Sequence, residues 1–260
     1  MQLKMKVAIN KTYNFIDSFD RIQEIIDSPS NFNQVSEIPN SDKLSYTNGY
    51  YLNCYSIFID IMDSSKLVEI YQKQTLSKIF RAYISEVLAL LESSTNCIDV
   101  NIVGNSVWAI YNAIKKEDVL QVFYAAYSAN SLIRTLNYKL SQKSLDPIKV
   151  GIGIEKGDAL MMLAGHEESK INKVIYMGSV ISDARNLCAK ACKSPINEIV
   201  ISKAVYDDLS GYKNKLENDF QKFFYQAESF YHGSIVNSGM NKWLNDVRQN
   251  IVISKNHTID

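Results

Sequence analysis

The sequence has no excess of either charge. Lysine and arginine together account for 28 of its 260 residues, and aspartate and glutamate account for another 28. A chain without a basic excess has no overall charge with which to hold duplex DNA by counterion release. We therefore expect no nucleic-acid partner for this protein.

Long apolar runs and abundant cysteine are also missing. No stretch of about 18 apolar residues occurs, and the N-terminal residues lack the continuous apolar core of a signal peptide. The cysteines are too few and too scattered for a disulfide framework, so we expect free thiols at Cys54, Cys97, Cys188 and Cys192. These absences predict a cytoplasmic protein with no membrane partner.

The chain does contain enough apolar residues, 46%, to bury a core, which excludes a disordered or fibrous protein. Apolar residues at helical spacing predict a helix within residues 11–27, and Pro29 marks its end. A polar connector follows and finishes in an Asn48-Gly49 turn. We expect residues 1–48 to form an N-terminal helix and connector, and residues 49–260 to form the main domain.

The main domain alternates strand and helix patterns. Its first predicted elements are a buried strand (50–61), one long helix or two consecutive ones (66–92), a β-hairpin across Gly104-Asn105 (97–103 and 106–112), a helix (117–140) and a strand (148–157). This order is the split βαβ pattern of an α+β, ferredoxin-like (βαββαβ) fold. Further predicted elements are strands over 159–165, 173–178 and 197–202, helices over 179–193 and 203–212, and a last strand within 220–233.

The segment FIDIMDSS, residues 58–65, places an aspartate at the end of an apolar strand. It is similar to the F-x-D-I-x-G-F-T pattern of class III nucleotidyl cyclases, the adenylate and guanylate cyclase family. The resemblance implies that Asp60 binds two catalytic metal ions, Mn²⁺ or Mg²⁺, and that Ile61 offers its main-chain carbonyl. It also implies that the loop of Asp63, Ser64 and Ser65 holds the triphosphate, although Asp63 or Ser64 is equally suited to cap the following helix.

The segment NIVGNSVWAIYN, residues 101–112, resembles the K-x-x-G-D hairpin of the same family, whose aspartate is the second metal ligand. Here Asn105 takes that place. An amide oxygen coordinates Mg²⁺ or Mn²⁺ but is neutral, and a unit charge about 4 Å away is worth roughly 4 kcal/mol at an effective dielectric of 20. Four readings stay open: a natural weak site, a degenerate inactive site, an inactivating substitution, or an asparagine that merely serves the turn.

The segment VIYMGSVISDARNLCAKACKSP, residues 174–195, is similar to the family's glycine followed by an N-x-A-x-R helix. In the family, this helix positions the ribose and supplies the cation for the α-phosphate. Without a gap, Ser182 and Asn186 take these places; shifted by one turn, Asn186 and Lys190 do. We prefer Asn186 and Lys190, with Arg185 in reserve, because catalysis needs a cation where charge develops. The alternative is an amphipathic helix with solvated cations.

Two base-reading positions of the purine cyclases are occupied by Asn101 and Ile175, which match neither purine code. Tyr50 adds an aromatic ring that could stack on a base, although packing is its commoner use. The chain as a whole resembles the pyrimidine cyclases of bacterial Pycsar anti-phage defence. That resemblance implies CTP or UTP as substrate, and cyclic CMP or cyclic UMP as a signal to a separate effector.

The resemblance further implies a homodimer, with two-ion sites shared at the subunit interface. Three alternatives remain: a catalytically inactive cyclase-homology module that binds nucleotide, a purine cyclase, and an unrelated ferredoxin-like interaction domain whose polar clusters are caps and turns.

Overall fold

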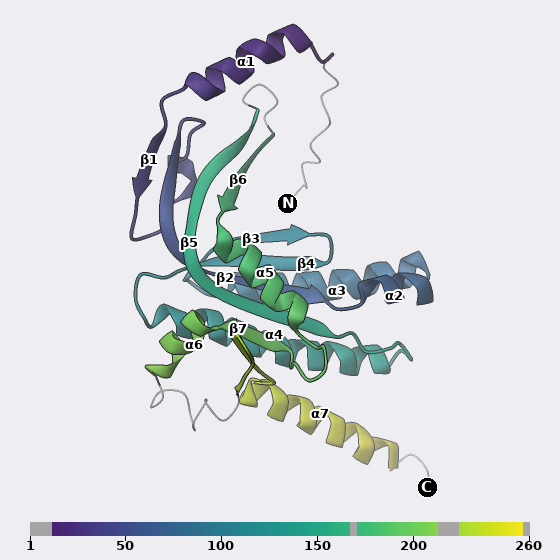
Figure 1. Ribbon diagram of the computed structural model, residues 1–260. Helices are drawn as coiled ribbons and strands as arrows, with labels where there is room; N and C mark the ends of the chain where they lie inside the picture. Colours follow the sequence, from purple (N-terminus) through teal and green to yellow (C-terminus); the bar gives the residue numbers. More distant parts are fainter. Residues whose placement is uncertain (1–11, 167–170, 213–223, 257–260) are drawn as a thin grey trace. The chain divides into compact units, whose positions relative to one another are not determined.

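A computed structural model describes residues 12–166, 171–212 and 224–256 of the protein (Figure 1). Its elements, in chain order, are α1 (Phe15–Asp27), β1 (Asn31–Gln34), the 3-10 helix η1 (Ser41–Lys43), β2 (Asn48–Ile61), α2 (Ser64–Ile70), α3 (Lys73–Glu92), β3 (Cys97–Val103), β4 (Ser106–Asn112), α4 (Asp118–Ser141), β5 (Val150–His166), β6 (Ile171–Met177), α5 (Ser179–Lys190), β7 (Ile199–Ser202), α6 (Lys203–Ser210), β8 (Tyr225–Gln226), β9 (Phe230–Gly233) and α7 (Ser238–Asn256).

The chain divides into two compact units. Unit 1 comprises Met1–Leu52 and Leu160–Met177, and unit 2 comprises Asn53–Ala159 and Gly178–Asp260. Strands β2 and β5 contribute residues to both units. The division into an extension and a main domain at residues 48 and 49 stays a prediction.

The sheet of unit 2 confirms the predicted ferredoxin-like order. Its strands follow the order β3-β4-β2-β5-β7-β9-β8, and β4 pairs antiparallel with both β3 and β2. Strand β7 pairs parallel with β5 and antiparallel with β9. Strand β2, the first strand of unit 2, therefore lies inside the sheet, between the hairpin strand β4 and β5.

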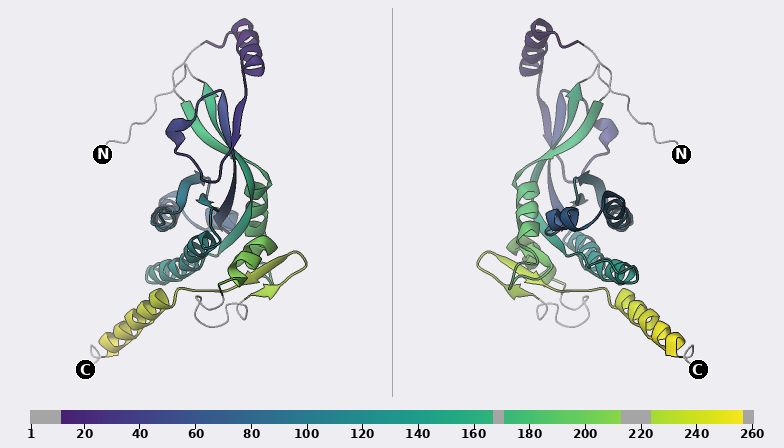
Figure 2. Two further views of the ribbon diagram at one scale, coloured as in Figure 1. Left: turned by 90° about the vertical axis from the view of Figure 1, so that its left-hand side faces the viewer. Right: turned by 90° about the vertical axis from the view of Figure 1, so that its right-hand side faces the viewer.

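Helices cover both faces of this sheet, and Figure 2 shows α4 and α5 on opposite sides of it. Alternate residues of β2, such as Ile57 and Ile59, are fully buried in one core with α3, α4 and α6. Phe58, which points to the other face, packs with Ala184 and Cys188 of α5. In the second half of β2, the period-two alternation of a strand thus directs successive side chains to opposite helical layers.

Unit 1 is built on two strand pairs. Strand β1 pairs parallel with the start of β2, and β5 pairs antiparallel with β6. Tyr46 donates a hydrogen bond to Asn172 Oδ1 within this unit. The predicted helix within residues 11–27 is confirmed as α1, but the connector was predicted without the short elements β1 and η1.

Several element predictions need correction. The two strands predicted over 148–157 and 159–165 form one continuous strand, β5. The tail beyond Gly233 contains the helix α7, which the sequence reading missed. The helix predicted over 179–193 ends at Lys190. Residues 66–92 confirm the second of their two predicted alternatives, since they belong to the consecutive helices α2 and α3. Of the last predicted strand, residues 220–223 lie outside the described residues, and the remainder forms β8 and β9.

None of the helices within the described ranges is long and apolar enough to cross a membrane.

Candidate active site

The predicted ligand Asp60 lies near the end of β2, on the sheet face that α5 covers. It follows Phe58 by two residues, so their side chains share that face. The Tyr83 hydroxyl donates a hydrogen bond of 2.8 Å to the Ile59 carbonyl and fixes this end of the strand. Strand register sets Asp60 opposite Ser106, the first residue after the Gly104-Asn105 turn.

That register brings Asn105 to Asp60. The Asn105 amide nitrogen donates hydrogen bonds to Asp60 Oδ1 at 2.5 Å and to the Ile61 carbonyl at 3.1 Å. Gly104 precedes it with φ of 63°, a left-handed conformation that favours glycine. Three residues that the sequence predicted as metal ligands are therefore brought together, and two of their oxygens converge on a single donor.

The two oxygens that accept from Asn105 show whether the residues present fit a divalent cation. A carboxylate oxygen and a main-chain carbonyl aimed at one point are ligands that Mg²⁺ and Mn²⁺ prefer, and the NH₂ group stands there as the positive partner. For Asn105 to act as a ligand, its amide must turn so that Oδ1 faces Asp60. Among the described residues there is no group of three or more histidine, cysteine, aspartate or glutamate side chains that could hold a metal ion. A metal at this site would thus depend on one carboxylate.

Burial dominates the electrostatics of Asp60. It raises the pKa of this carboxyl above the ordinary value of 3.8, while the Ile61 backbone N–H, the positive charge of Arg185 and the Asn105 amide oppose the rise. Arg185 is thus the α5 cation whose field reaches Asp60 of the same chain. The three opposing interactions do not offset the cost of burying the ionised carboxylate, as expected of a group that binds a cation.

The remainder of α5 places its predicted residues at the surface. Asn186 and Lys190 are exposed, whereas Ala184, Leu187 and Cys188 form the buried side. The Lys190 ammonium lies over the ring of Phe230, 5.7 Å from its centroid. Within one chain, Lys190 therefore contacts β9. Arg185 is the α5 cation whose charge lowers the pKa of the predicted ligand Asp60.

Helix α5 lies directly on β5 because two glycines make room for it. A Cβ atom on Gly153 would lie 2.2 Å from the Ala184 carbonyl oxygen and 2.2 Å from the Cys188 nitrogen. A Cβ on Gly151 would lie 2.7 Å from the Cys188 carbonyl oxygen. These glycines thus set how closely α5, which carries Arg185, approaches β5.

The loop between β2 and α2 has the backbone of a tight turn. Asp63 adopts φ of 54° and ψ of 33°, at the position where the cyclase pattern has glycine. Its side chain makes no capping hydrogen bond and pairs instead with Lys66 Nζ at 3.1 Å. Capping by Asp63 is therefore not the role of this carboxylate, while phosphate binding by Asp63, Ser64 and Ser65 stays a prediction.

Asn101 is buried on β3 and lies opposite Trp108. Its amide donates a hydrogen bond of 3.2 Å to Asp99 Oδ2. Trp108 in turn stacks on Phe58, with ring centroids 5.4 Å apart. The sequence analysis did not single out Trp108. The available signal was its spacing, since Trp108 follows Ser106 by two residues on β4 and therefore shares the sheet face of Ser106, which lies opposite Asp60.

The other two predicted base-reading residues belong to unit 1. Ile175 lies on β6 opposite Met162 and is half-buried. Tyr50 is also half-buried and lines a cavity of about 640 Å³ together with Lys43 and Pro39.

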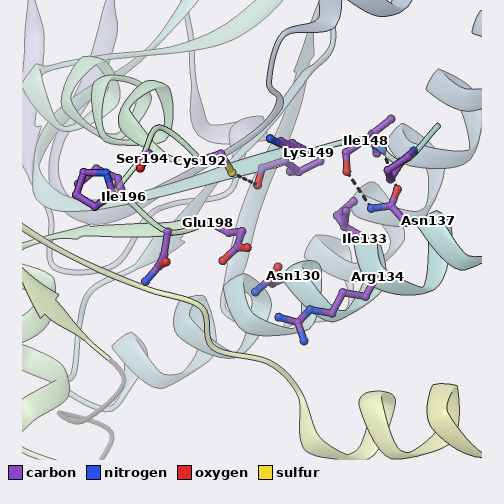
Figure 3. Close-up of a pocket in the computed structure, with 14 residues that line it drawn as sticks. Asn130, Ile133, Arg134, Asn137, Ile148, Lys149, Cys192, Ser194, Ile196 and Glu198 are labelled. Carbon is purple, nitrogen blue, oxygen red and sulfur yellow. Dashed lines mark hydrogen bonds between the residues drawn. The ribbon is translucent and has the colours of Figure 1, made fainter.

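A second cavity, of about 540 Å³, lies in unit 2 between α4, the start of β5 and the loop after α5. Figure 3 shows Arg134, Lys149 and Glu198 among its lining side chains. Within the described chain, Glu198 Oε2 is buried without a hydrogen-bond partner. The predicted site residues are not among those that line this cavity.

Solved structures place the fold in a known class. A class III adenylyl cyclase-like ATP-binding protein from Pseudomonas aeruginosa aligns with 88% of this chain and 49% of its own at 14% identity, with a TM-score of 0.65. The guanylyl cyclase Cya2 aligns with 73% of this chain and 95% of its own at 14% identity, with a TM-score of 0.58. The non-canonical dimeric guanylyl cyclase domain of the RhoGC fusion protein from Blastocladiella emersonii aligns with 63% of this chain and 85% of its own at 13% identity, with a TM-score of 0.51. The chain has the fold of the class III nucleotidyl cyclases.

Curated relatives define the family within that class. A uridylate cyclase of Gulbenkiania mobilis is 33% identical over 225 residues, which cover 84% of this chain and 86% of that protein. A uridylate cyclase of Treponema porcinum is 28% identical over 233 residues, which cover 90% and 81%. No protein-family model matches the sequence. The chain belongs to the uridylate cyclase family, which confirms the prediction of a pyrimidine nucleotide cyclase.

Proposed function

We propose that this protein converts UTP to 3′,5′-cyclic UMP and pyrophosphate. The observation that carries the proposal is its similarity, over most of both chains, to proteins named uridylate cyclase. It favours UTP over CTP, the two pyrimidine substrates that the sequence left open. The convergence of Asp60, Ile61 and Asn105 on one point supports a catalytic site in the expected place.

The proposed cofactors are two divalent ions, Mn²⁺ or Mg²⁺. Asp60, the Ile61 carbonyl and the turned amide of Asn105 would hold them. When bound, such ions lower the pKa of the attacking 3′-hydroxyl and neutralise the leaving pyrophosphate.

The chain's own residues have proposed roles around that point. Arg185 supplies positive charge for the α-phosphate, in preference to Lys190, because its field already reaches Asp60. Asn186 orients the ribose. The triphosphate lies against the loop of Asp63, Ser64 and Ser65, and the base is read by Asn101, Ile175 and Tyr50.

The proposed enzyme is a homodimer whose sites lie at the subunit interface; one of the similar structures is described as a non-canonical dimer, which supports dimer formation alone. Residues 49–260 are the proposed catalytic domain. We place the enzyme in the cytoplasm, in keeping with its four free cysteines. There its cyclic product would act on a separate effector in anti-phage defence.

A second candidate is a cyclase-like module that binds nucleotide without turnover. Asn105 specifically favours it, because a neutral amide replaces the second carboxylate and its NH₂ group fills the position of the cation.

Purified protein incubated with Mn²⁺ and each of the four ribonucleoside triphosphates separates these candidates, with products identified by mass. We expect cyclic UMP from UTP. Nucleotide binding without any cyclic product, together with turnover by Asn105→Asp, would support the inactive module. Cyclic AMP from ATP alone would contradict the pyrimidine assignment.

A further inference from the structure

Helix α1 presents an apolar face that nothing in the described chain covers. Large apolar residues on it are 53% to 73% exposed: Phe15, Ile16, Phe19, Ile22, Ile25 and Ile26. No residue of α1 is buried. The helix is nonetheless well formed, since the Asn14 side chain caps it by accepting a hydrogen bond of 3.0 Å from the Ile16 backbone N–H.

A helix of this length needs a partner. It has 13 residues, and isolated helices shorter than about 12–15 residues are marginal in water even for favourable sequences. Most helical stability in proteins comes from packing of an amphipathic face. The exposed face is therefore the surface on which a partner stabilises α1.

The spacing on that face identifies the kind of partner. Phe15, Phe19, Ile22 and Ile26 follow one another at intervals of four, three and four residues, the a/d spacing with which one helix packs along another. Ile16 and Ile25 flank the seam. Every charged residue of the helix lies on the opposite side: Asp17, Asp20, Arg21, Glu24 and Asp27. The seam carries no charge, and its borders hold only the uncharged residues Ile16, Ser18, Gln23 and Ile25, so two copies of it can pack together without burying a charge.

We propose that α1 packs along this seam against α1 of a second copy of the chain. Four acidic residues against one arginine disfavour an anionic membrane surface as the occupant. Thirteen residues make a weak coiled coil alone. The homodimer of the proposed function, on which this inference rests, supplies both helices at the high effective concentration that makes a weak contact persist.

Cysteine cross-linking of the full chain tests the seam. Ile22→Cys lies near the middle of the seam and Glu24→Cys on its opposite side, so the two variants form a matched pair in either helix orientation. With a short bismaleimide, Ile22→Cys should give a covalent dimer well above the parent protein, whose native cysteines set the background. Glu24→Cys should remain at that background. Equal yields at the two positions, or no yield above the parent at Ile22→Cys, would overturn the inference.

Sedimentation provides a second measurement. Replacing both Ile22 and Ile26 by lysine should raise the dimer dissociation constant by at least about tenfold, whereas Glu24→Lys should leave it nearly unchanged. An unchanged constant in the double variant would contradict the seam, and so would α1-dependent binding of the protein to phosphatidylglycerol vesicles. Because neither measurement needs turnover, failure of the seam is distinguishable from failure of the cyclase assay.

Discussion

One amide group determines the state of the candidate site at the scale of single residues. The NH₂ group of Asn105 bridges Asp60 and the Ile61 carbonyl, so the metal-free site is held together without a cation. The same group must turn away before the asparagine oxygen can bind a metal. In the proposed function, these two hydrogen bonds would be exchanged for metal coordination.

Asp60 should weaken the metal-free fold. Burial raises its pKa in the folded chain, so the folded state holds its proton to a higher pH than the unfolded state does. The free energy of unfolding therefore falls as the pH rises from the ordinary value through the raised one, and then levels.

We predict that metal-free Asp60→Asn lacks this part of the pH dependence and melts a few degrees above the parent protein at pH 7. Thermal unfolding in chelator from pH 3 to 8 measures it, and Mn²⁺ should no longer raise the melting temperature of the variant. Asp63→Asn, at an exposed carboxylate, is the matched control with little change. An Asp60→Asn variant that melts below the parent would refute the argument.

Asn105→Asp should have opposite effects with and without metal. We predict Mn²⁺ binding tighter by about tenfold to a hundredfold, because a second charge joins the ligand set. Without metal, two carboxylates face each other and the melting temperature should fall. Calorimetric titration and thermal unfolding measure the two effects. In the control Asn105→Ala, stability should fall without a gain in affinity; weaker Mn²⁺ binding by Asn105→Asp would contradict the prediction.

At the scale of elements, the sequence was sufficient where the local composition was distinctive. The apolar residues of β2 predicted its burial and placed Asp60 near its end, and the Gly104-Asn105 pair predicted the hairpin. The amide orientation of Asn105 was not predictable, because it depends on the register between β2 and β4. The polar run Glu155–Asp158 broke the apolar pattern of β5, although the strand continues through it.

Helix α7 was missed because, within the described side chains of residues 238–249, only Leu244 is buried. Leu244 packs inward, but Trp243 beside it is exposed. The signal that the sequence reading overlooked is Asn237, whose side chain accepts a hydrogen bond of 3.1 Å from the Met240 backbone N–H. The Asn237 backbone N–H also donates to Ser131 Oγ of α4 at 2.7 Å, a long-range contact that local periodicity does not contain.

The contact between α5 and β5 gives an element-scale prediction. Gly153→Ala forces a Cβ against the backbone of α5, so it should lower the free energy of unfolding by about 1–3 kcal/mol and displace Arg185 from Asp60. Urea unfolding measures the loss. In the control Gly157→Ala, the new Cβ lies 3.3 Å from Val180 Cβ and the loss should be smaller. Equal stability of the two variants would show that α5 does not rest on Gly153.

At the scale of the whole molecule, the proposed residues are divided between the two units. The predicted metal ligands, the α5 residues, the phosphate loop and Asn101 belong to unit 2, whereas Tyr50 and Ile175 belong to unit 1. Strands β2 and β5 carry the chain from one unit to the other. The proposed function therefore assigns chemistry to unit 2 and part of the base reading to unit 1.

The central claim is that this chain makes cyclic UMP, and a competition experiment tests it most directly. The protein is incubated with Mn²⁺ and an equimolar mixture of UTP, CTP, ATP and GTP, and the cyclic products are quantified by mass. We predict cyclic UMP as the main product, abolished in Asp60→Asn. A main product other than cyclic UMP, or equal product from Asp60→Asn, would contradict the account.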